Sequence, residues 1–267
     1  MGFKSFTSLG SQGLISASVK NRTLAKGIYG VKLLNDKYTG AIFNIRRGSD
    51  NVTEDFFYTN STLSNSSGTS LSTFLSGSIA YITIWYDQSL KGNNGTQTNL
   101  TLQPIYNPTN LYVDFIPNRT FTLPDGTVPF GNSDYTITIK HNVIDVKNLG
   151  TWLSSGTFAK LQSNNFRMTG NGEYFNYWFD DRGNFSVGSA YAVGNTITYQ
   201  YDGTDVRCYV NSQLNSTSTP NVVRRTTSIN NLIGARQGNG EPLNGQLYYV
   251  YIYDYPLTQI QRSKIEL

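Results

Sequence analysis

The fold is decided most clearly by the stretch Tyr199-Gln200-Tyr201-Asp202-Gly203-Thr204-Asp205-Val206-Arg207-Cys208-Tyr209-Val210. Its two halves alternate between side chains suited to a core and side chains suited to water, which is the pattern of a half-buried strand. Between the halves stands Asp202-Gly203, a pair that tight turns prefer because glycine adopts positive φ angles at little cost. The stretch therefore predicts an antiparallel β-hairpin.

Similar strand-like runs recur on both sides of this hairpin, separated by short turn signals. The expected strands cover residues 41–46, 80–86, 110–116, 135–145, 151–155, 174–179, 184–188, 195–201, 205–210, 229–235 and 246–253. Many short strands with frequent turns are typical of a sandwich or barrel. The sequence thus predicts an all-β protein: a two-sheet antiparallel jelly-roll sandwich with a short C-terminal helix in residues 258–267.

The regions between these runs give less definite expectations. Residues 26–34 are compatible with a short helix or a strand, residues 70–75 with a short helix, and the Ser/Asn/Thr/Gly tract 59–69 with a loop. Residues 1–25 are polar and Gly/Ser-rich, as in an arm or a first edge strand. Because no internal repeat or linker interrupts residues 26–267, we expect these residues to form a single domain.

Composition excludes several classes of protein. Charged residues are 14% of the chain, the net charge is +4, and basic residues occur in isolated pairs, which argues against nucleic-acid binding. No apolar run is long enough to span a membrane, and the N-terminal residues lack the apolar core of a secretory signal. Cys208 and His141 are the only residues of their types, so we expect no internal disulfide, zinc site or Cys–His catalytic pair.

Two segments of the first half resemble the amino-terminal part of the arabinofuranosidase B catalytic domain. They are Tyr38-Thr39-Gly40-Ala41-Ile42 with Ile45–Asn51, and Ile82–Ser89 followed by Asn93-Asn94. Later segments are similar to the wider laminin-G/concanavalin A-like group: the hairpin Tyr201–Asn211, the ending Ile233–Asp254, and Tyr255-Pro256-Leu257-Thr258-Gln259. The resemblance implies a concanavalin A-like jelly roll.

The resemblance also implies where catalytic carboxyls would stand. In the arabinofuranosidases, a glutamate nucleophile and an aspartate acid/base perform retaining hydrolysis, which needs both carboxyls about 5 Å apart. The stretch matching the first position, Thr151–Phe158, contains no Asp or Glu, and the aspartate position falls on Gln237 or Gly238. Glu241 is nearby, but one carboxyl cannot fill both roles. The family's vicinal cysteine pair is also missing, and we therefore expect no enzymatic activity.

One of the family-like elements has a structural interpretation. Asp and Ser at the end of a strand close turns by bonding nearby backbone amides, and a tryptophan in a strand is most often a core residue. We interpret this element as a structural motif, made of Trp85, Tyr86, Asp87, Gln88 and Ser89.

A second cluster suggests a binding face. Strand alternation in residues 173–182 would place Tyr174, Asn176, Trp178 and Asp180 on one side, where rings stack on sugars and polar groups bond hydroxyls. With Asn239 and Glu241 these four residues form the candidate glycan-binding set. Alternatively, Asp180-Asp181 could chelate calcium, or the segment is a sandwich strand that enters a turn. No other cofactor is expected.

The function expected first is a non-catalytic interaction protein, a structural or attachment component of a virus particle. It would lie in a virion or cell-surface assembly, with protein subunits or surface glycans as partners. This hypothesis rests on the uncharged polar surface, the single cysteine and the recurrence of jelly rolls in capsids and lectins. The alternatives are a lectin-like carbohydrate-binding module and an arabinofuranosidase-like glycoside hydrolase, and a cytoplasmic location is the alternative address.

Overall fold

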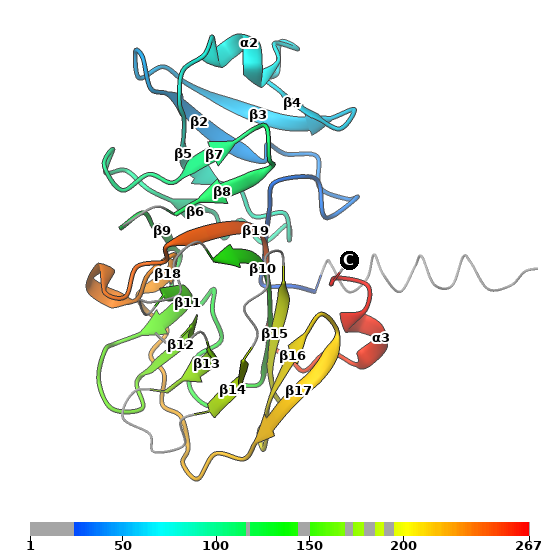
Figure 1. Ribbon diagram of the computed structural model, residues 1–267, viewed down its shortest axis with the longest axis vertical. Helices are drawn as coiled ribbons and strands as arrows, with labels where there is room; N and C mark the ends of the chain where they lie inside the picture. The colour runs from blue at the N-terminus through cyan, green and yellow to red at the C-terminus, as the bar shows by residue number, and fades with distance from the viewer. Residues whose placement is uncertain are drawn as a thin grey trace, which may run out of the picture.

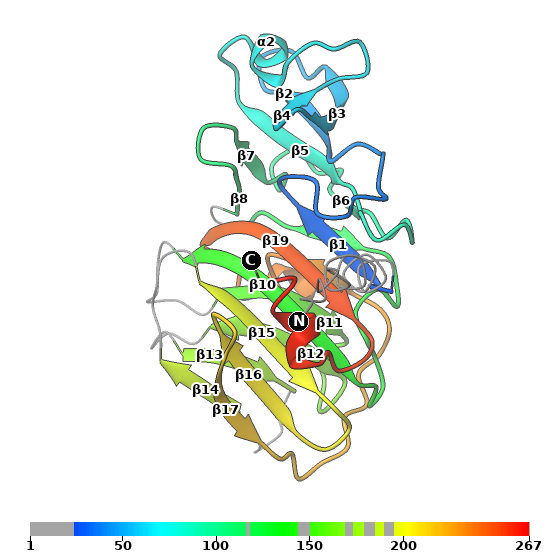
Figure 2. The ribbon, with the colours of Figure 1, turned by 90° about the vertical axis from the view of Figure 1, so that its right-hand side faces the viewer.

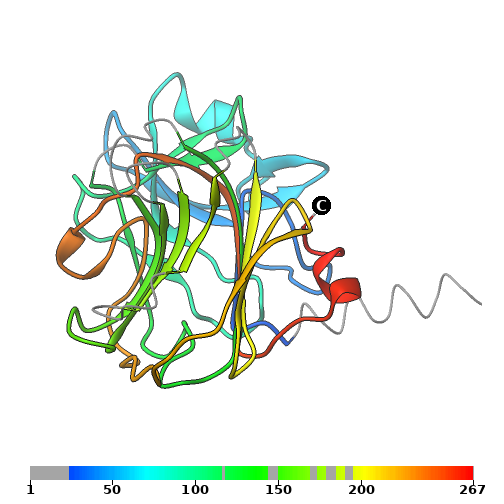
Figure 3. The ribbon, with the colours of Figure 1, turned by 60° about the horizontal axis from the view of Figure 1, so that its bottom comes forward.

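The chain folds into two antiparallel β-sheets that face each other (Figure 3). The computed structural model describes residues 24–115, 118–143, 150–168, 173–178, 185–189 and 195–266. Within these residues the secondary structure is almost entirely strand, with two short α-helices. The expected all-β sandwich is confirmed.

The first sheet has β19 and β10 at its centre. Each strand pairs with the next in the order β17, β16, β15, β10, β19 and β1. Their bounds are β1 (Gly27–Gly30), β10 (Tyr135–Val143), β15 (Thr196–Tyr201), β16 (Val206–Val210), β17 (Gln213–Ser218) and β19 (Gly245–Tyr253).

The second sheet is longer and extends beyond the sandwich. Its sandwich part runs through β14 (Phe185–Ser189), β13 (Glu173–Tyr177), β12 (Ser163–Met168), β11 (Gly150–Gly156), β18 (Asn231–Ile233), β9 (Phe121–Leu123) and β6 (Gly95–Thr96). It continues into a lobe made of β5 (Ala80–Trp85), β2 (Phe43–Arg47), β3 (Thr53–Thr59), β4 (Thr62–Ser64) and α2 (Leu71–Leu75). This lobe stands at the top of Figures 1 and 2, and β7 (Ile105–Asn107) and β8 (Tyr112–Asp114) join β5 to β19.

The core lies between the two sheets and is rich in rings. Tyr199 of β15 packs against Phe166 of β12 with ring centroids 5.3 Å apart, and Tyr135 of β10 meets the same phenylalanine at 5.5 Å. All three side chains are fully buried. Rings of this size contribute much of the apolar surface that a sandwich removes from water.

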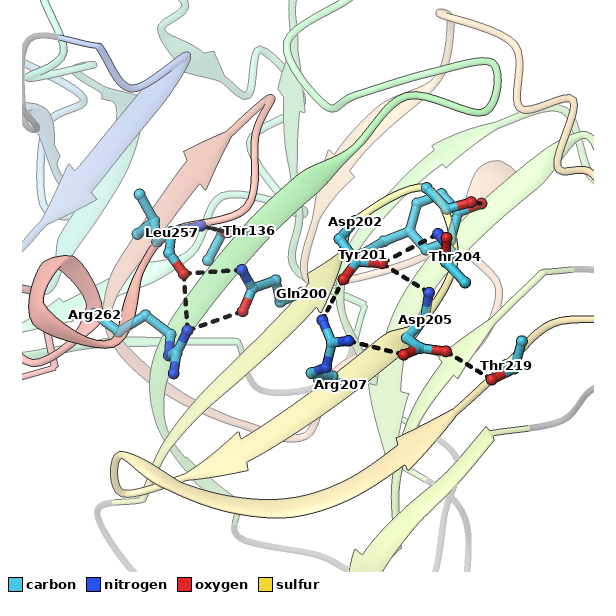
Figure 4. Close-up of polar contacts among 11 residues, drawn as sticks. Thr136, Gln200, Tyr201, Asp202, Thr204, Asp205, Arg207, Thr219, Leu257 and Arg262 are labelled. Carbon is cyan, nitrogen blue, oxygen red and sulfur yellow. Dashed lines mark hydrogen bonds and ion pairs between the residues drawn. The ribbon is translucent and has the colours of Figure 1, made fainter.

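The hairpin expected at residues 199–210 forms between β15 and β16 (Figure 4). Gly203 has a φ of 85°, and the Asp202 carboxylate accepts hydrogen bonds from the backbone of Thr204 and Asp205 at 3.1 and 2.8 Å. Arg207 bonds to both Asp202 and Asp205. The turn is therefore closed by the aspartate side chain as well as by glycine.

The outer face of β15 is covered by α3 (Gln259–Arg262), the expected C-terminal helix. Arg262 is 8% exposed, donates to Gln200 Oε1 at 2.9 Å and to the Leu257 carbonyl at 2.8 Å, and lies 3.8 Å from the ring centroid of Tyr209 (Figure 4). A capping box at Thr258 and Gln261 begins the helix. One buried guanidinium thus fixes a helix too short to be stable alone.

Several strands escape prediction from the sequence. β12 reads Ser-Asn-Asn-Phe-Arg-Met and β17 reads Gln-Leu-Asn-Ser-Thr-Ser, and neither has an apolar alternation. The tract 59–69, expected as a loop, contains β4. Residues 26–34, left open between helix and strand, include β1. The arm expected at residues 1–25 lies almost wholly outside the described residues.

His141 of β10 is buried between the sheets against aromatic rings. Its ring lies 4.7 Å from Trp152 and 5.4 Å from Tyr174, and neither of its nitrogens has a hydrogen-bond partner among the described residues. Burial lowers the pKa of His141 to about 3, because the charged ring cannot be solvated there. The histidine is therefore held neutral in the folded protein.

Replacing Arg262 tests the anchoring of the C-terminal helix. We expect Arg262→Ala to lower the free energy of unfolding by about 2 kcal/mol, because it removes two charged hydrogen bonds from a buried site. Urea denaturation measures the change. Ile260→Ser, at a residue 67% exposed on the same helix, is the control and should change stability by less than about 0.5 kcal/mol. Equal losses in both variants would contradict this role.

The His141 environment predicts acid sensitivity. Its folded pKa of about 3 lies below the unfolded value of about 6.5, so its contribution to stability is complete above pH 6.5 and is lost as pH falls toward 3. Between pH 7.5 and 5.0 the wild type should lose about 2 kcal/mol more than His141→Phe, which keeps a ring against Trp152. Urea denaturation at the two pH values gives the comparison, and parallel losses would refute it.

Candidate functional site

The outward side of β12 and β13 carries polar and aromatic side chains together. Strand pairing sets Arg167 opposite Phe175 and Asn165 opposite Tyr177, and residues directly opposite each other share a face. The alternate pairs, Phe166 with Asn176 and Met168 with Tyr174, face the core instead. The sheet therefore separates a buried inner side from an outer side on which Arg167 and Tyr177 are partly exposed.

Glu241 reaches this outer side from the loop between β18 and β19. Its carboxylate lies 2.6 Å from Arg167 Nη1 and 3.3 Å from Arg236 Nε, and its backbone carbonyl accepts from the Thr151 amide at 3.1 Å. The three charged side chains are 11 to 22% exposed. The carboxylate is thus held in one place by two guanidinium groups from different parts of the chain.

Aromatic rings flank both arginines. The Arg167 guanidinium lies 4.0 Å from the ring centroid of Tyr177 and 5.3 Å from that of Phe175, and the Arg236 guanidinium lies 3.9 Å from that of Phe158. Stacked guanidinium groups keep their hydrogen-bonding edges free for other partners. We call this group the Glu241 face; it comprises Phe158, Arg167, Phe175, Tyr177, Arg236 and Glu241.

The short turn before Glu241 fits around Arg236. The 3-10 helix η1 (Gln237–Asn239) is closed by a hydrogen bond from the Arg236 amide to the Gly240 carbonyl at 2.9 Å. A Cβ added at Gly240 would meet the Arg236 guanidinium carbon at 2.6 Å. Glycine at this position lets the guanidinium lie directly against the backbone.

The residues of the expected glycan-binding set lie in different environments, and three of them are buried in the core. Tyr174, Asn176 and Trp178 are 1%, 0% and 1% exposed and lie inside the sandwich, so they do not form an outer binding face. The Tyr135 hydroxyl donates to Asn176 Oδ1, and the Asn176 amide donates to Asn164 Oδ1 at 2.6 Å. Tyr174, Asn176 and Trp178 do lie on one side of the segment, but that side faces the core and not the solvent. Aromatic residues occupy both faces of β13, so the sequence pattern does not indicate which face is buried.

The remaining members of that set differ in their positions. Glu241 lies at the centre of the face just described, and Asn239 is exposed in the same loop. Asp180, and the Asp180-Asp181 pair considered for calcium, lie outside the described residues. Within the described ranges, no group of three or more His, Cys, Asp or Glu side chains is placed to hold a metal ion.

Sequence reasoning missed the two arginines that fix Glu241. Arg167 lies on β12, which was not recognised as a strand, and its partner is 74 residues away in the chain. Arg236 lies within the family-like stretch Ile233–Glu241, but nothing in the sequence indicates that it pairs with Glu241. The one available signal is that Arg167 is the single charged residue within the polar run Ser163–Met168.

The element interpreted as a structural motif closes a turn and anchors a distant segment. Trp85 is fully buried and donates from Nε1 to the Gly30 carbonyl at 3.1 Å. The Asp87 carboxylate accepts from the backbone amides of Ile28, Ser89 and Asn93 at 2.8 to 3.0 Å. Tyr86 donates to Asp55 at 2.8 Å, and Ser89 donates to Asp87 at 2.7 Å.

Gln88 of this motif holds the segment after β1. Its side-chain oxygen accepts from the Leu34 amide at 2.7 Å, its side-chain nitrogen donates to the Lys32 carbonyl at 3.0 Å, and its backbone carbonyl accepts from Asn35 at 2.8 Å. These bonds are buried or partly buried. The motif thus fixes the path of residues 32–35 across the lobe.

Cys208 is buried in β16. Burial raises the pKa of its thiol well above the usual range, as expected for a packing residue rather than a nucleophile. In the part of the chain that the structure describes, neither α2 nor α3 has the length or the apolar character needed to cross a membrane.

Comparison with solved structures shows the same architecture in carbohydrate-active enzymes. A GH54 α-L-arabinofuranosidase soaked with a cyclic sulfate inhibitor superposes with a TM-score of 0.69 at 13% identity, over 91% of this chain and 61% of that chain. An arabinofuranosidase complexed with arabinofuranosyl-α-1,2-xylobiose gives 0.68 at 14% identity with the same coverage. A Trypanosoma rangeli sialidase in complex with sialic acid gives 0.51 at 16% identity, over 69% and 31%. This chain thus spans about three fifths of the arabinofuranosidase chains.

These findings correct two expectations. The hypothesis of a structural or attachment component of a virus particle is wrong, because the likeness is to arabinofuranosidases and a sialidase. The expectation that the chain is not an enzyme is also contradicted, because residues 25–114 match the family model described as alpha-L-arabinofuranosidase B, catalytic. A search among curated proteins gave no match.

The second half of the chain identifies the superfamily. Residues 117–261, more than half of the sequence, match the laminin-G family model described as the concanavalin A-like lectin/glucanases superfamily. The match covers β9 to β19, which include most strands of the sandwich and those that carry the Glu241 face. The chain therefore belongs to the concanavalin A-like lectin/glucanase superfamily.

Proposed function

We propose that this protein is a carbohydrate-active domain of arabinofuranosidase-like architecture that binds arabinofuranosyl-bearing glycans at the Glu241 face. The observation that carries the proposal is the carboxylate of Glu241, held between Arg167 and Arg236 beside aromatic rings. The choice of glycan follows from the likeness to arabinofuranosidases, in both the first half of the sequence and the fold.

The chemistry of the Glu241 face suits a sugar. A carboxylate accepts hydrogen bonds from hydroxyl groups, guanidinium groups donate to ring and hydroxyl oxygens, and these charge-assisted bonds are about twice as strong as neutral ones. The Tyr177 ring offers an apolar surface on which the C–H groups of a sugar pack. Because ion pairs already hold the polar groups, binding costs little ordering of side chains.

Hydrolysis of arabinofuranosides is the second candidate function. The match of residues 25–114 to an arabinofuranosidase catalytic model favours it. Retaining hydrolysis requires two carboxyls about 5 Å apart, and inverting hydrolysis requires a separation of about 6.5–9.5 Å. In this second candidate function, Glu241 would supply one of the two carboxyls that hydrolysis requires.

Binding is tested by neutralising Glu241. We expect Glu241→Gln to weaken binding of arabino-oligosaccharides at least 10-fold, because it replaces one acceptor oxygen with an NH2 donor and removes the negative charge that holds the two arginines. Tyr177→Ala should weaken binding about 3- to 10-fold through loss of the ring surface. Isothermal titration calorimetry with arabinotriose and with xylotriose carrying an arabinofuranosyl branch measures both effects.

The matched control is Asp205→Asn. It also removes a carboxylate that is ion-paired with an arginine, but in the β15–β16 hairpin of the other sheet. Its affinity should equal that of the wild type, and thermal unfolding should show that all variants are folded. Unchanged affinity in Glu241→Gln would refute the proposed binding face.

The second candidate predicts turnover of 4-nitrophenyl α-L-arabinofuranoside. If Glu241 supplies one of the two carboxyls, Glu241→Gln should lower kcat at least about 100-fold, the lower end of what general acid–base catalysis contributes. Release of nitrophenol, followed spectrophotometrically, gives the rate. A wild-type protein without turnover, or a Glu241→Gln variant with full turnover, would contradict this candidate.

A further inference from the structure

The largest of the described cavities lies in the lobe built by β2 to β5, away from the Glu241 face. It encloses about 540 Å³ between the segment after β1 and the β3–β4 hairpin. Two other cavities enclose about 220 and 270 Å³. Because small-molecule pockets usually span about 300–1,000 Å³, the lobe cavity is the one of these three with the size of a ligand site.

One wall of the cavity is an aromatic ring that is fixed in place. The Tyr38 hydroxyl donates to the Ala41 carbonyl at 2.7 Å, and its backbone amide donates to the Asn35 carbonyl at 2.9 Å. A Cβ added at Gly40 would meet the Tyr38 oxygen at 2.5 Å, so glycine allows the ring to lie on the backbone. Gln88 holds Leu34 and Asn35 just before this ring. The wall is therefore formed before any ligand arrives.

The opposite wall comes from the β3–β4 hairpin and is also fixed. Phe57 and Tyr58 of β3, both half-buried, are among the residues that line the cavity. Asn65, just after β4, donates to the Glu54 carboxylate and accepts from the Thr69 amide at 2.8 Å. The Asn65 amide group is thus oriented, and Ser66 beside it is exposed at the rim.

Charge in the cavity selects the class of ligand. Asp36 is the only acidic or basic side chain among the residues that line it, and no hydrogen bond or ion pair occupies its carboxylate in the described part of the chain. The exposed Asp36 carboxylate disfavours an anionic ligand and accepts hydrogen bonds from hydroxyl groups. Thr39 and Thr59 add further hydroxyl groups. Rings, hydroxyls and one carboxylate together suit a neutral sugar.

We propose that this cavity is a second saccharide-binding site, which takes a neutral pentose or hexose unit through Asp36, Tyr38 and Tyr58. It is separate from the Glu241 face and does not depend on the function assigned there. On a polysaccharide, two sites in one chain would raise the overall affinity, since the second contact becomes intramolecular.

The test uses the full chain with Glu241→Gln as background, so that binding at the Glu241 face is suppressed. Neutral trisaccharides (arabinotriose, xylotriose and cellotriose) are titrated by isothermal calorimetry and by protein NMR. We expect at least one of them to bind this background, and Asp36→Ala to weaken that binding at least 10-fold. Asp50→Ala, which removes an exposed carboxylate from the same lobe, should leave the affinity unchanged.

Two further variants keep the test decisive. Tyr58→Ala should also weaken binding, and thermal unfolding measures how far it loosens the packing of β3. Ser66→Trp fills the cavity from the exposed rim without removing a packed side chain, and should abolish binding while thermal unfolding stays unchanged. Full affinity in Asp36→Ala and Ser66→Trp, or binding of only glucuronate or tetramethylammonium in place of neutral sugars, would overturn the proposal. Failure of all three trisaccharides to bind the Glu241→Gln background would overturn it as well, whereas weaker binding with a remaining Asp36-dependent component would support two separate sites.

Discussion

The structure depends on the pairing of β19 with strands from distant parts of the chain. This strand pairs with β1 at Gly27–Gly30, with β8 at Val113 and Asp114, and with β10 along most of its length. Its alternation places Val250 and Ile252 in the sandwich core, and Tyr249, Tyr251 and Tyr253 in a second apolar cluster on the other side. A strand buried on both faces cannot slip by one residue, because every side chain would change sides.

The position of the Glu241 face follows from this arrangement. The loop that carries Arg236 and Glu241 joins β18, which pairs with β11, to β19, which belongs to the opposite sheet. The loop must therefore cross the edge of the sandwich beside β11, where the Thr151 amide bonds to Glu241. Arg167 lies on the neighbouring strand, β12, and forms the ion pair with Glu241. Side chains far apart in sequence are brought together by sheet order alone.

The predictability of each element follows from its burial pattern. β15, β16 and β19 alternate clearly because one face meets the core between the sheets and the other carries mostly polar or tyrosine side chains, and all three are expected from the sequence. β12 buries Ser163, Asn164 and Asn165, and buried polar residues that bond to one another leave no periodic apolar signal. The inward direction of Tyr174 and Asn176 was likewise hidden. The alternation of side chains can be deduced from the sequence of one strand. Which face of the strand is buried depends on the position of the opposite sheet, and the strand's own sequence does not contain that information.

Both proposed binding surfaces have the same physical basis: polar groups oriented by contacts made before a ligand binds. At the Glu241 face, two guanidinium groups hold a carboxylate, and rings hold the guanidinium groups. In the lobe, the buried Gln88 fixes the segment that ends in the Tyr38 ring. Recognition of sugars needs such order, because each hydroxyl exchanges a good hydrogen bond to water for one to protein, and only well-placed partners make that exchange favourable. The element Trp85 to Ser89, which contains Gln88, thus has a structural role that extends to the shape of a binding cavity.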